Sequence, residues 1–336
     1  MTKTKILFLI LLIAGTVFII RQQRNMPYQH NEGMVFGTFY NITYQCEQDL
    51  KSSVEEVLQQ VDNEYSMFNE ESTVSKFNHN QPVSLSPMFL RVFCQAQEVS
   101  AETDGAFDVT VAPLVNAWGF GFKQQQMPSP AQVDSLLQLV GMRKLKYDEQ
   151  KGTIEKSLPG MMLDFSAIAK GFGVDMVAQL LRQHGVQNFM VEIGGEVVAH
   201  GISPNRVPWR IGVTKPTDDS LSTQGELQTV LNVTDMAMAT SGNYRNFYYK
   251  GGRKYAHTID PRSGYPVQHS LLSATVLAKD CATADAYATS FMVLGIDGAK
   301  AVLERHPELM AYFIYTDAQG QLATWYSPSL EDKIAE

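Results

Sequence analysis

The order of strand-like and helix-like segments most restricts what this chain can fold into. Segments rich in β-branched and aromatic residues, such as 36–44 and 273–277, are predicted as strands. Segments with apolar residues at helical spacing, such as 50–65 and 282–294, are predicted as helices. The two types follow one another without the regular strand–helix alternation that builds parallel sheets. The sequence therefore predicts an α+β fold, and neither a doubly wound sheet nor a β/α barrel.

The other predicted elements lie between residue 87 and residue 326. Helices are predicted at 87–103, 130–141, 167–184 and 298–305. Strands are predicted at 161–165, 188–192, 210–214 and 227–233, with one hairpin at 247–259 and another at 310–326. No segment repeats at intervals of roughly 20–50 residues, as solenoids and propellers require. One folded unit over residues 33–330 is therefore expected.

The first 25 residues are a different kind of segment. Ile6–Ile20 is an apolar run between the basic residues Lys3, Lys5, Arg21 and Arg24. A helix of this length spans about 22 Å, less than the ~30 Å hydrocarbon core of a bilayer. The run suits a signal-peptide core or a short anchor, and the missing small-residue cleavage site favours an uncleaved anchor. Basic residues on both sides give only a slight preference for an exported body.

Lipid attachment is not expected. The stretch Ile13–Thr16 is similar to a bacterial lipobox in which Thr16 replaces the lipidated cysteine. We therefore expect residues 1–25 to be an anchor or signal segment, residues 26–32 a polar linker and residues 33–330 the functional domain. The expected location is the bacterial inner membrane, with the body in the periplasm and no lipoprotein anchor.

Charge and cysteine content exclude several classes of protein. The chain has a net charge of −8, and all four charged residues among the first 25 are basic, so the remainder carries −12. A body this acidic is a poor nucleic-acid binder, because phosphate neutralisation supplies most of that affinity. An anionic ligand would be repelled by this negative charge unless a metal or local hydrogen-bond donors offset the repulsion. Three scattered cysteines are too few for a disulfide framework or a thiolate zinc site.

Two carboxylates lie beside glycines or small residues. Asp108 follows a glycine turn, and on its own this pattern indicates a capped turn more than a site. Asp164 ends a predicted strand just before a helix start built of small residues, with Lys170 in the first turn. Such a start exposes backbone N–H groups to an anion, although Asp164 or Ser166 could equally be the N-cap. The glycine spacing of a Walker loop or dinucleotide fingerprint is missing.

Two further segments offer small polar side chains. Ser241 and Gly242 combine a hydroxyl with a glycine, which suits close contact with a ligand. His257 precedes an Asp-Pro turn, where a single histidine is more often structural than catalytic. Asp285 and Thr289 lie four residues apart on a predicted helix, so their oxygens face one way. They suit a hard cation such as Mg²⁺ and not zinc, the alternative being an ordinary helix start.

Together and in this order, these segments resemble the ApbE family of FAD:protein FMN transferases. The resemblance covers roughly residues 33–330, and it extends to Gly37-Thr38, Ile193–Glu196, His257–Pro261 and Ala284–Ala286. Each match is weak alone, but the ordered set is specific. The resemblance implies a single α+β, T-fold-like unit with an FAD cleft between two halves and Mg²⁺ on the diphosphate.

The resemblance also implies roles for individual residues. Asp285 and Thr289 would be side-chain metal ligands, and Ala167 would add a backbone carbonyl. His257 matches the family histidine near the reacting phosphate, and His257 and Asp285 are both candidates for the catalytic base. The residues expected to contact FAD are Phe36, Phe68, Ala106, Phe107, Asp108, Asp164, Lys170, Ser241, Gly242 and Ile259.

This chain departs from the family pattern at three positions. Phe36 stands where many members have Met, and Phe68 stands where a Tyr often contacts the flavin. Ala288 replaces an Asp that lies beside the metal in some members. A ring face would remain at residue 68 without the hydroxyl, and the metal site would be weaker.

The implied reaction transfers FMN from FAD to a Thr or Ser hydroxyl of a target protein and releases AMP. Two alternatives stay open: an Mg²⁺-dependent FAD pyrophosphatase giving FMN and AMP, and a non-catalytic FAD-binding periplasmic protein. The expected partners are FAD, acceptor proteins such as subunits of membrane redox pumps, and the membrane through residues 1–25. No nucleic-acid partner is expected.

Overall fold

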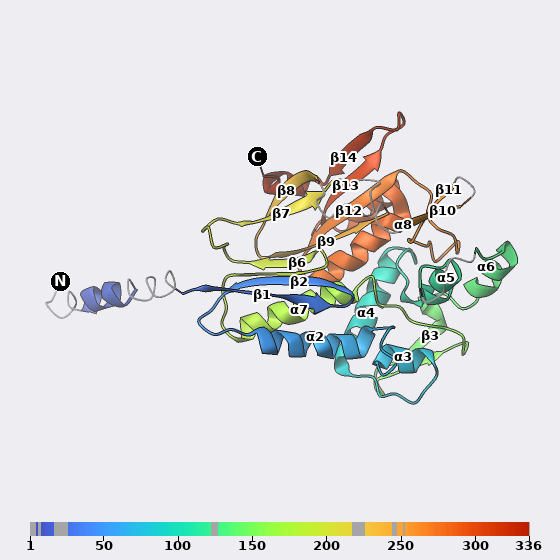
Figure 1. The fold of residues 1–336 in the computed structure, drawn as a ribbon, viewed down its shortest axis with the longest axis horizontal. Coiled ribbons are helices and arrows are strands. Elements are labelled where there is room, and N and C mark those ends of the chain that lie inside the picture. Colours follow the sequence, from blue (N-terminus) through green and yellow to red (C-terminus); the bar gives the residue numbers. More distant parts are fainter. Residues whose placement is uncertain are drawn as a thin grey trace.

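An antiparallel sheet organises the fold (Figure 1). The computed structural model describes residues 5, 8–16, 26–121, 127–216, 226–243, 247–250 and 253–335. Its main sheet has eight strands in the order β1-β2-β5-β6-β9-β12-β13-β14, and every neighbouring pair is antiparallel. The strands are β1 (Tyr28–Val35), β2 (Thr38–Gln45), β5 (Phe189–Ile193), β6 (Glu196–His200), β9 (Met236–Gly242), β12 (Leu271–Ala278), β13 (Met310–Thr316) and β14 (Leu322–Tyr326). The α+β prediction is confirmed.

Long helices cover one face of this sheet (Figure 1). They are α2 (Lys51–Tyr65), α4 (Pro87–Glu102), α7 (Ala169–Gln183) and α8 (Cys281–Arg305). Apolar residues of α2 and α7 pack with those of β2 and β5 in one core cluster. A second cluster joins α4 and α8 to β12 and β13. The helix starts of α7 and α8 therefore meet near the middle of the sheet.

A hairpin packs on the opposite face. Its strands are β7 (Trp209–Thr214) and β8 (Leu227–Val233), and its apolar residues pack against side chains of β6, β9, β12 and β13. The smaller elements are α3 (Thr73–Asn78), α5 (Ala112–Ala117), α6 (Pro130–Leu137), β3 (Leu145–Asp148), β4 (Thr153–Lys156), β10 (Phe247–Lys250), β11 (Arg253–Ala256) and the 3₁₀ helices η1 (Val109–Val111), η2 (Met142–Lys144) and η3 (Pro328–Lys333).

The capping residues explain why several helices begin where they do. The Ser86 side chain accepts a hydrogen bond from the N–H of Phe89, and Pro87 fills the first turn of α4. Ser129 and Gln132 form a capping box at α6. Asp280 caps α8 by accepting from the N–H of Thr283 at 2.9 Å.

The expected linker is wrong for most of its length. Residues 28–32 belong to β1, which pairs with β2 from Tyr28 to Val35. Their polar composition indicated a linker because β1 is an edge strand whose outer face meets solvent. The one buried polar residue among them, Asn31, is satisfied by the Tyr44 hydroxyl and by Asp49.

One other expectation changes. Residues 161–165 form no strand; the Asn78 side chain pairs with both the N–H and the carbonyl of Leu163, at 2.7 and 2.8 Å. The two helices expected at 282–294 and 298–305 are both present; they follow one another within α8 and are separated by a kink at Gly295, where φ is 70°. His269 Nε2 donates to the Met292 carbonyl at 2.8 Å, an acceptor that the kink leaves without its helical partner.

The N-terminal run lies largely outside the described residues. Residues 8–16 are helical. Within the described ranges, the structure contains no helix with the length and apolar character needed to cross a membrane. The anchor stays a prediction.

Candidate active site

A pocket of about 740 Å³ gathers most of the predicted site residues. The β5–β6 turn, β7, β9, the first half of α8 and the segments around residues 106–111, 164–170 and 257–261 line it. The predicted residues that it brings together are Phe68, Ala106, Phe107, Asp108, Asp164, Ala167, Lys170, Ser241, Gly242, His257, Ile259, Asp285 and Thr289. Its volume is within the roughly 300–1,000 Å³ usual for small-molecule sites.

Phe36 lies elsewhere. It occupies the β1–β2 turn with φ of 52° and is absent from the pocket lining. Its ring packs against α7, where a Cβ added to Gly173 would come within 2.7 Å of Phe36 Cε2. Phe36 therefore packs, partly buried, against the core beside α7, and its contact with FAD stays a prediction.

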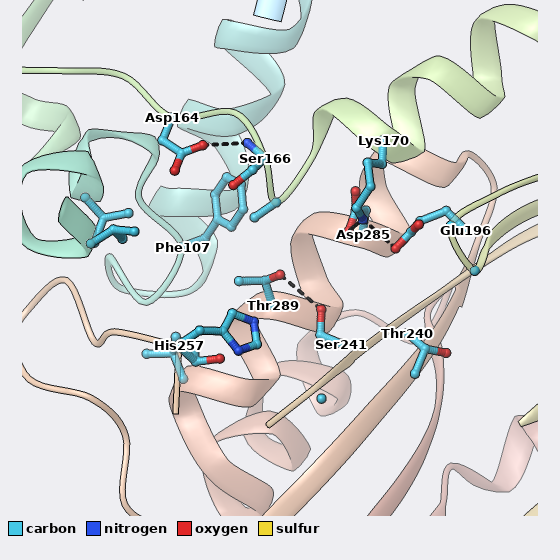
Figure 2. A pocket seen from close by; sticks show the side chains of 18 of the residues that line it. Phe107, Asp164, Ser166, Lys170, Glu196, Thr240, Ser241, His257, Asp285 and Thr289 are labelled. Atoms are coloured by element: carbon cyan, nitrogen blue, oxygen red, sulfur yellow. Dashed lines mark hydrogen bonds and ion pairs between the residues drawn. The ribbon is translucent and has the colours of Figure 1, made fainter. Parts of the chain in front are cut away.

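A charged cluster of Lys170, Glu196 and Asp285 lines one side of the pocket (Figure 2). Lys170 Nζ is 2.6 Å from Glu196 Oε1 and 3.8 Å from Asp285 Oδ1. Asp285 and Glu196 are both buried. Glu196 Oε2 is also buried and accepts no hydrogen bond from the described residues. Two carboxylates therefore share one ammonium group, and one of their oxygens is unused.

Burial sets the ionisation of this cluster. It raises the pKa of Asp285 and of Glu196 above the usual carboxyl range, and the Lys170 ammonium only partly offsets this effect. Burial alone would lower the pKa of Lys170, but the Asp285 and Glu196 carboxylates outweigh it and raise that pKa above its ordinary value. When both carboxylates are ionised they outnumber the single Lys170 ammonium, and an added cation would stabilise that ionised form.

Close approach of α7 to α8 positions Asp285. A Cβ on Gly171 would lie 2.3 Å from the Cys281 carbonyl oxygen, so only glycine permits this contact. Asp175 accepts from the backbone N–H groups of Cys281 and Ala282 at 2.8 and 2.9 Å, and it ties α7 to the first turn of α8. The first turns of α7 and α8 are therefore held in a fixed position relative to each other.

The same junction frees a backbone oxygen. In a continuous helix the N–H of Gly171 would donate to the carbonyl of Ala167. Here it donates to Asp285 Oδ2 at 3.1 Å. The Ala167 carbonyl therefore accepts no backbone hydrogen bond among the described residues, and Ala167 lines the pocket together with Thr289.

Asp108 and Asp164 hold the loops that form the other end of the pocket. Asp108 accepts from the N–H of Thr110 at 2.8 Å and from the N–H of Met142 at 3.1 Å. Asp164 accepts from the N–H of Ser166 at 2.8 Å (Figure 2). Burial raises the pKa of both carboxyls. These bonds fix the backbone on which Ala106, Phe107 and Ala167 are presented.

Hydroxyl groups and His257 occupy the remaining wall. Ser241 Oγ and Thr289 Oγ1 are 3.1 Å apart and hydrogen-bonded. Figure 2 shows the His257 ring on the same side of the pocket as this pair. Phe120 lies edge-on to the imidazole, with ring centroids 6.4 Å apart. His257 is therefore placed beside the hydroxyl pair.

Several lining residues were not predicted. Glu196 belongs to a recognised motif, but its role as a partner of Lys170 was missed. The available signal was an acidic residue directly after two glycines at a strand start. The contributions of β7, from Ile211 to Thr214, had no sequence signal because they depend on how the hairpin folds over the sheet.

The donor set is compatible with a hard cation. The described residues hold no cluster of three or more His, Cys, Asp or Glu side chains suited to a metal. The available donors are instead mixed oxygens: the Asp285 carboxylate, the Thr289 hydroxyl and the Ala167 carbonyl. Such ligands suit Mg²⁺ or Ca²⁺ and disfavour zinc, which takes nitrogen and sulfur.

Comparison with known proteins agrees with this geometry. Residues 36–313 match the ApbE family. FAD:protein FMN transferase of Haemophilus influenzae is 39% identical over 302 residues, which cover 85% of this chain and 86% of that protein. The protein of the same name from Vibrio cholerae is 37% identical over 299 residues, covering 86% and 88% of the two chains.

Solved structures show the same fold. The flavin transferase ApbE from Vibrio cholerae superposes with a TM-score of 0.82 at 34% identity, covering 92% of this chain and 99% of that one. Apo flavinyl transferase ApbE from Pseudomonas stutzeri gives 0.81 at 32% identity, covering 92% and 97%. Similarity in sequence and in fold to these proteins extends over nearly the whole described body. The chain belongs to the ApbE family.

Proposed function

We propose that this chain is an Mg²⁺-dependent FAD:protein FMN transferase, which moves the FMN half of FAD onto a Thr or Ser hydroxyl of a target protein and releases AMP. The observation that supports this most directly is the ion-pair cluster of Lys170 with the buried carboxylates Asp285 and Glu196, which lines a pocket of suitable volume. The names of the relatives from Haemophilus influenzae and Vibrio cholerae support the same activity.

The residues present fit magnesium. Asp285, Thr289 and the Ala167 carbonyl would hold it, and a divalent cation would offset the charge that Lys170 alone leaves unbalanced. When bound, Mg²⁺ supplies charge neutralisation for the diphosphate and for the departing phosphate. This also explains how a body carrying −12 outside its first 25 residues can hold an anionic dinucleotide.

The chain's own residues orient the substrate. The small residues Ser166 and Ala167 in the turn just before α7 permit close approach of a phosphate, and the positive end of the helix dipole favours it. At the other end, the exposed Phe68 offers a ring face to the flavin, and the buried Phe107 belongs to the pocket wall. Asp108 and Asp164 keep the intervening backbone in place.

In the transfer step, the acceptor hydroxyl oxygen bonds to the FMN-side phosphorus while the bond from that phosphorus to the AMP phosphate oxygen breaks. AMP departs with the bridging oxygen, and the hydroxyl proton passes to a base. His257 and Asp285 both line the pocket and are the candidate bases.

The test uses purified full-length protein in detergent with FAD, Mg²⁺ and membrane proteins from cells that lack this chain. We expect AMP release that depends on Mg²⁺ and acceptor, with an equal amount of FMN on a Thr or Ser located by mass spectrometry. Equal AMP release without acceptor would mean an FAD pyrophosphatase. Bound FAD with no AMP under any condition would mean a non-catalytic binding protein.

The proposed setting is the periplasmic face of a bacterial inner membrane. The apolar run Ile6–Ile20 supports an anchor, and Thr16 in place of a lipobox cysteine speaks against lipid. Subunits of membrane redox pumps are the proposed acceptors.

A further inference from the structure

Two large apolar side chains lie exposed and directly opposed near the β1–β2 turn. Met34 of β1 pairs with Phe39 of β2, and the two are 68% and 70% exposed. Directly opposed residues of antiparallel strands point to the same face, so they form one surface, the Met34–Phe39 patch. The next pair on that face, Glu32 and Asn41, is polar. Single exposed apolar residues are ordinary, but an adjacent aromatic and methionine pair suits a protein contact.

This patch shares a sheet face with one wall of the pocket. Cross-strand register aligns a single row over four strands: Asn41, Glu192, Val197 and Met238. The last three line the pocket. Phe39 lies two residues before Asn41 and so faces the same way. Its carbonyl accepts from the N–H of Gly194, another lining residue, at 3.0 Å. The surface is therefore continuous from the patch to the pocket.

The β7–β8 hairpin leaves this end of the face uncovered. Trp209 of β7 meets β1 edge-on at Tyr28, with ring centroids 6.5 Å apart. The hairpin otherwise packs over β6, β9, β12 and β13. Met34 lies at the opposite end of β1 from Tyr28, beyond that contact. The Met34–Phe39 patch is thus an exposed surface beside the pocket, with the β7–β8 hairpin on one side of it.

We propose that the Met34–Phe39 patch docks the acceptor protein. The inference rests on the proposed function, because transfer to a hydroxyl of another protein requires that protein to contact the pocket rim. Phe39 lies on β2 and the lining residue Val197 lies on β6. These strands are two strand spacings apart, about 10 Å, and an extended chain covers that distance in about three residues. The expected partner therefore presents an apolar side chain about three to four residues from its acceptor hydroxyl.

The test compares Met34→Ser and Phe39→Ser with the parent enzyme. The probe is the membrane protein in which mass spectrometry has located the FMN-bearing residue. We expect the KM for this acceptor to rise about tenfold in each variant, as for a moderate interface hot spot, with kcat and FAD affinity unchanged. The matched control is Leu322→Ser, because Leu322 is 46% exposed on β14 at the other edge of the sheet. It is expected to match the parent.

A cross-linking measurement identifies the occupant directly. Benzoylphenylalanine at position 39 is expected to cross-link to acceptor peptides beside the flavinylated residue, and the same group at position 322 is not. Cross-links only to a second copy of the chain or to lipid would overturn the proposal, as would parental KM values in both serine variants. If the parent itself transfers no FMN, the proposed function fails instead, so the two failures are distinguishable.

Discussion

Asp285 accepts a backbone hydrogen bond and also supplies a negative charge, and a single substitution can separate these two roles. Its Oδ2 accepts from the N–H of Gly171, and its charge faces Lys170. Asp285→Asn keeps an acceptor for the backbone but removes the charge that a cation needs. We expect FMN transfer at limiting Mg²⁺ to fall at least about 100-fold, with the melting temperature nearly unchanged. Asp297→Asn on the exposed side of α8 is the control. Parental activity of Asp285→Asn would remove Asp285 from the metal site.

His257 is the second residue to test. Because the imidazole lies on the Ser241–Thr289 side of the pocket, His257→Ala is expected to slow single-turnover transfer by roughly 10² to 10⁴-fold. FAD titration should show little change in affinity. His184→Ala, an exposed histidine at the end of α7, is the control. A rate within about threefold of the parent would mean that His257 is not the base, and Asp285 would become the leading candidate.

At the scale of elements, the contact between the first turns of α7 and α8 positions Lys170 and Asp285. Asp175 accepts from two backbone N–H groups, whereas an asparagine side chain has only one oxygen to offer. Asp175→Asn is therefore expected to leave one N–H at the start of α8 facing an amide NH₂ group. We predict a loss of about 1–3 kcal/mol in the free energy of unfolding, together with weaker Mg²⁺ activation.

Urea unfolding and Mg²⁺ titration of transfer check this prediction together. Asp134→Asn on the short helix α6 is the control, because Asp134 is exposed and remote from the junction. A variant with parental stability and parental Mg²⁺ dependence would show that the junction does not depend on Asp175.

At the scale of the whole molecule, we expect the first 25 residues to decide where the enzyme works. We predict that the full chain resists carbonate extraction from membranes and that its mass shows neither trimming nor lipid. The matched variant is Thr16→Cys, which completes the lipobox-like stretch and is expected to gain the mass of a lipid. A released, N-terminally shortened parent protein would show cleavage instead.

The order of strand-like and helix-like segments predicted the fold class, and the resemblance to the ApbE family supplied most of the predicted residues that line the pocket. Asp285 and Thr289 are four residues apart, so one helix brings their oxygens together. Glu196 and Asp175 were missed as partners, because their roles depend on contacts with residues distant in the chain. β1 was missed because an edge strand tolerates polar residues on its open face.

The spread of the pocket lining along the chain has a consequence for synthesis. The lining begins at Met67 and ends at Val293, and its charged centre needs both Lys170 and Asp285. A growing chain therefore has no binding site until α8 has emerged and packed against α7. FAD added during cell-free translation should remain exchangeable on ribosome-bound chains stalled before residue 285. The chain would retain FAD only after α8 has left the ribosome, so FAD binding would mark the final stage of folding.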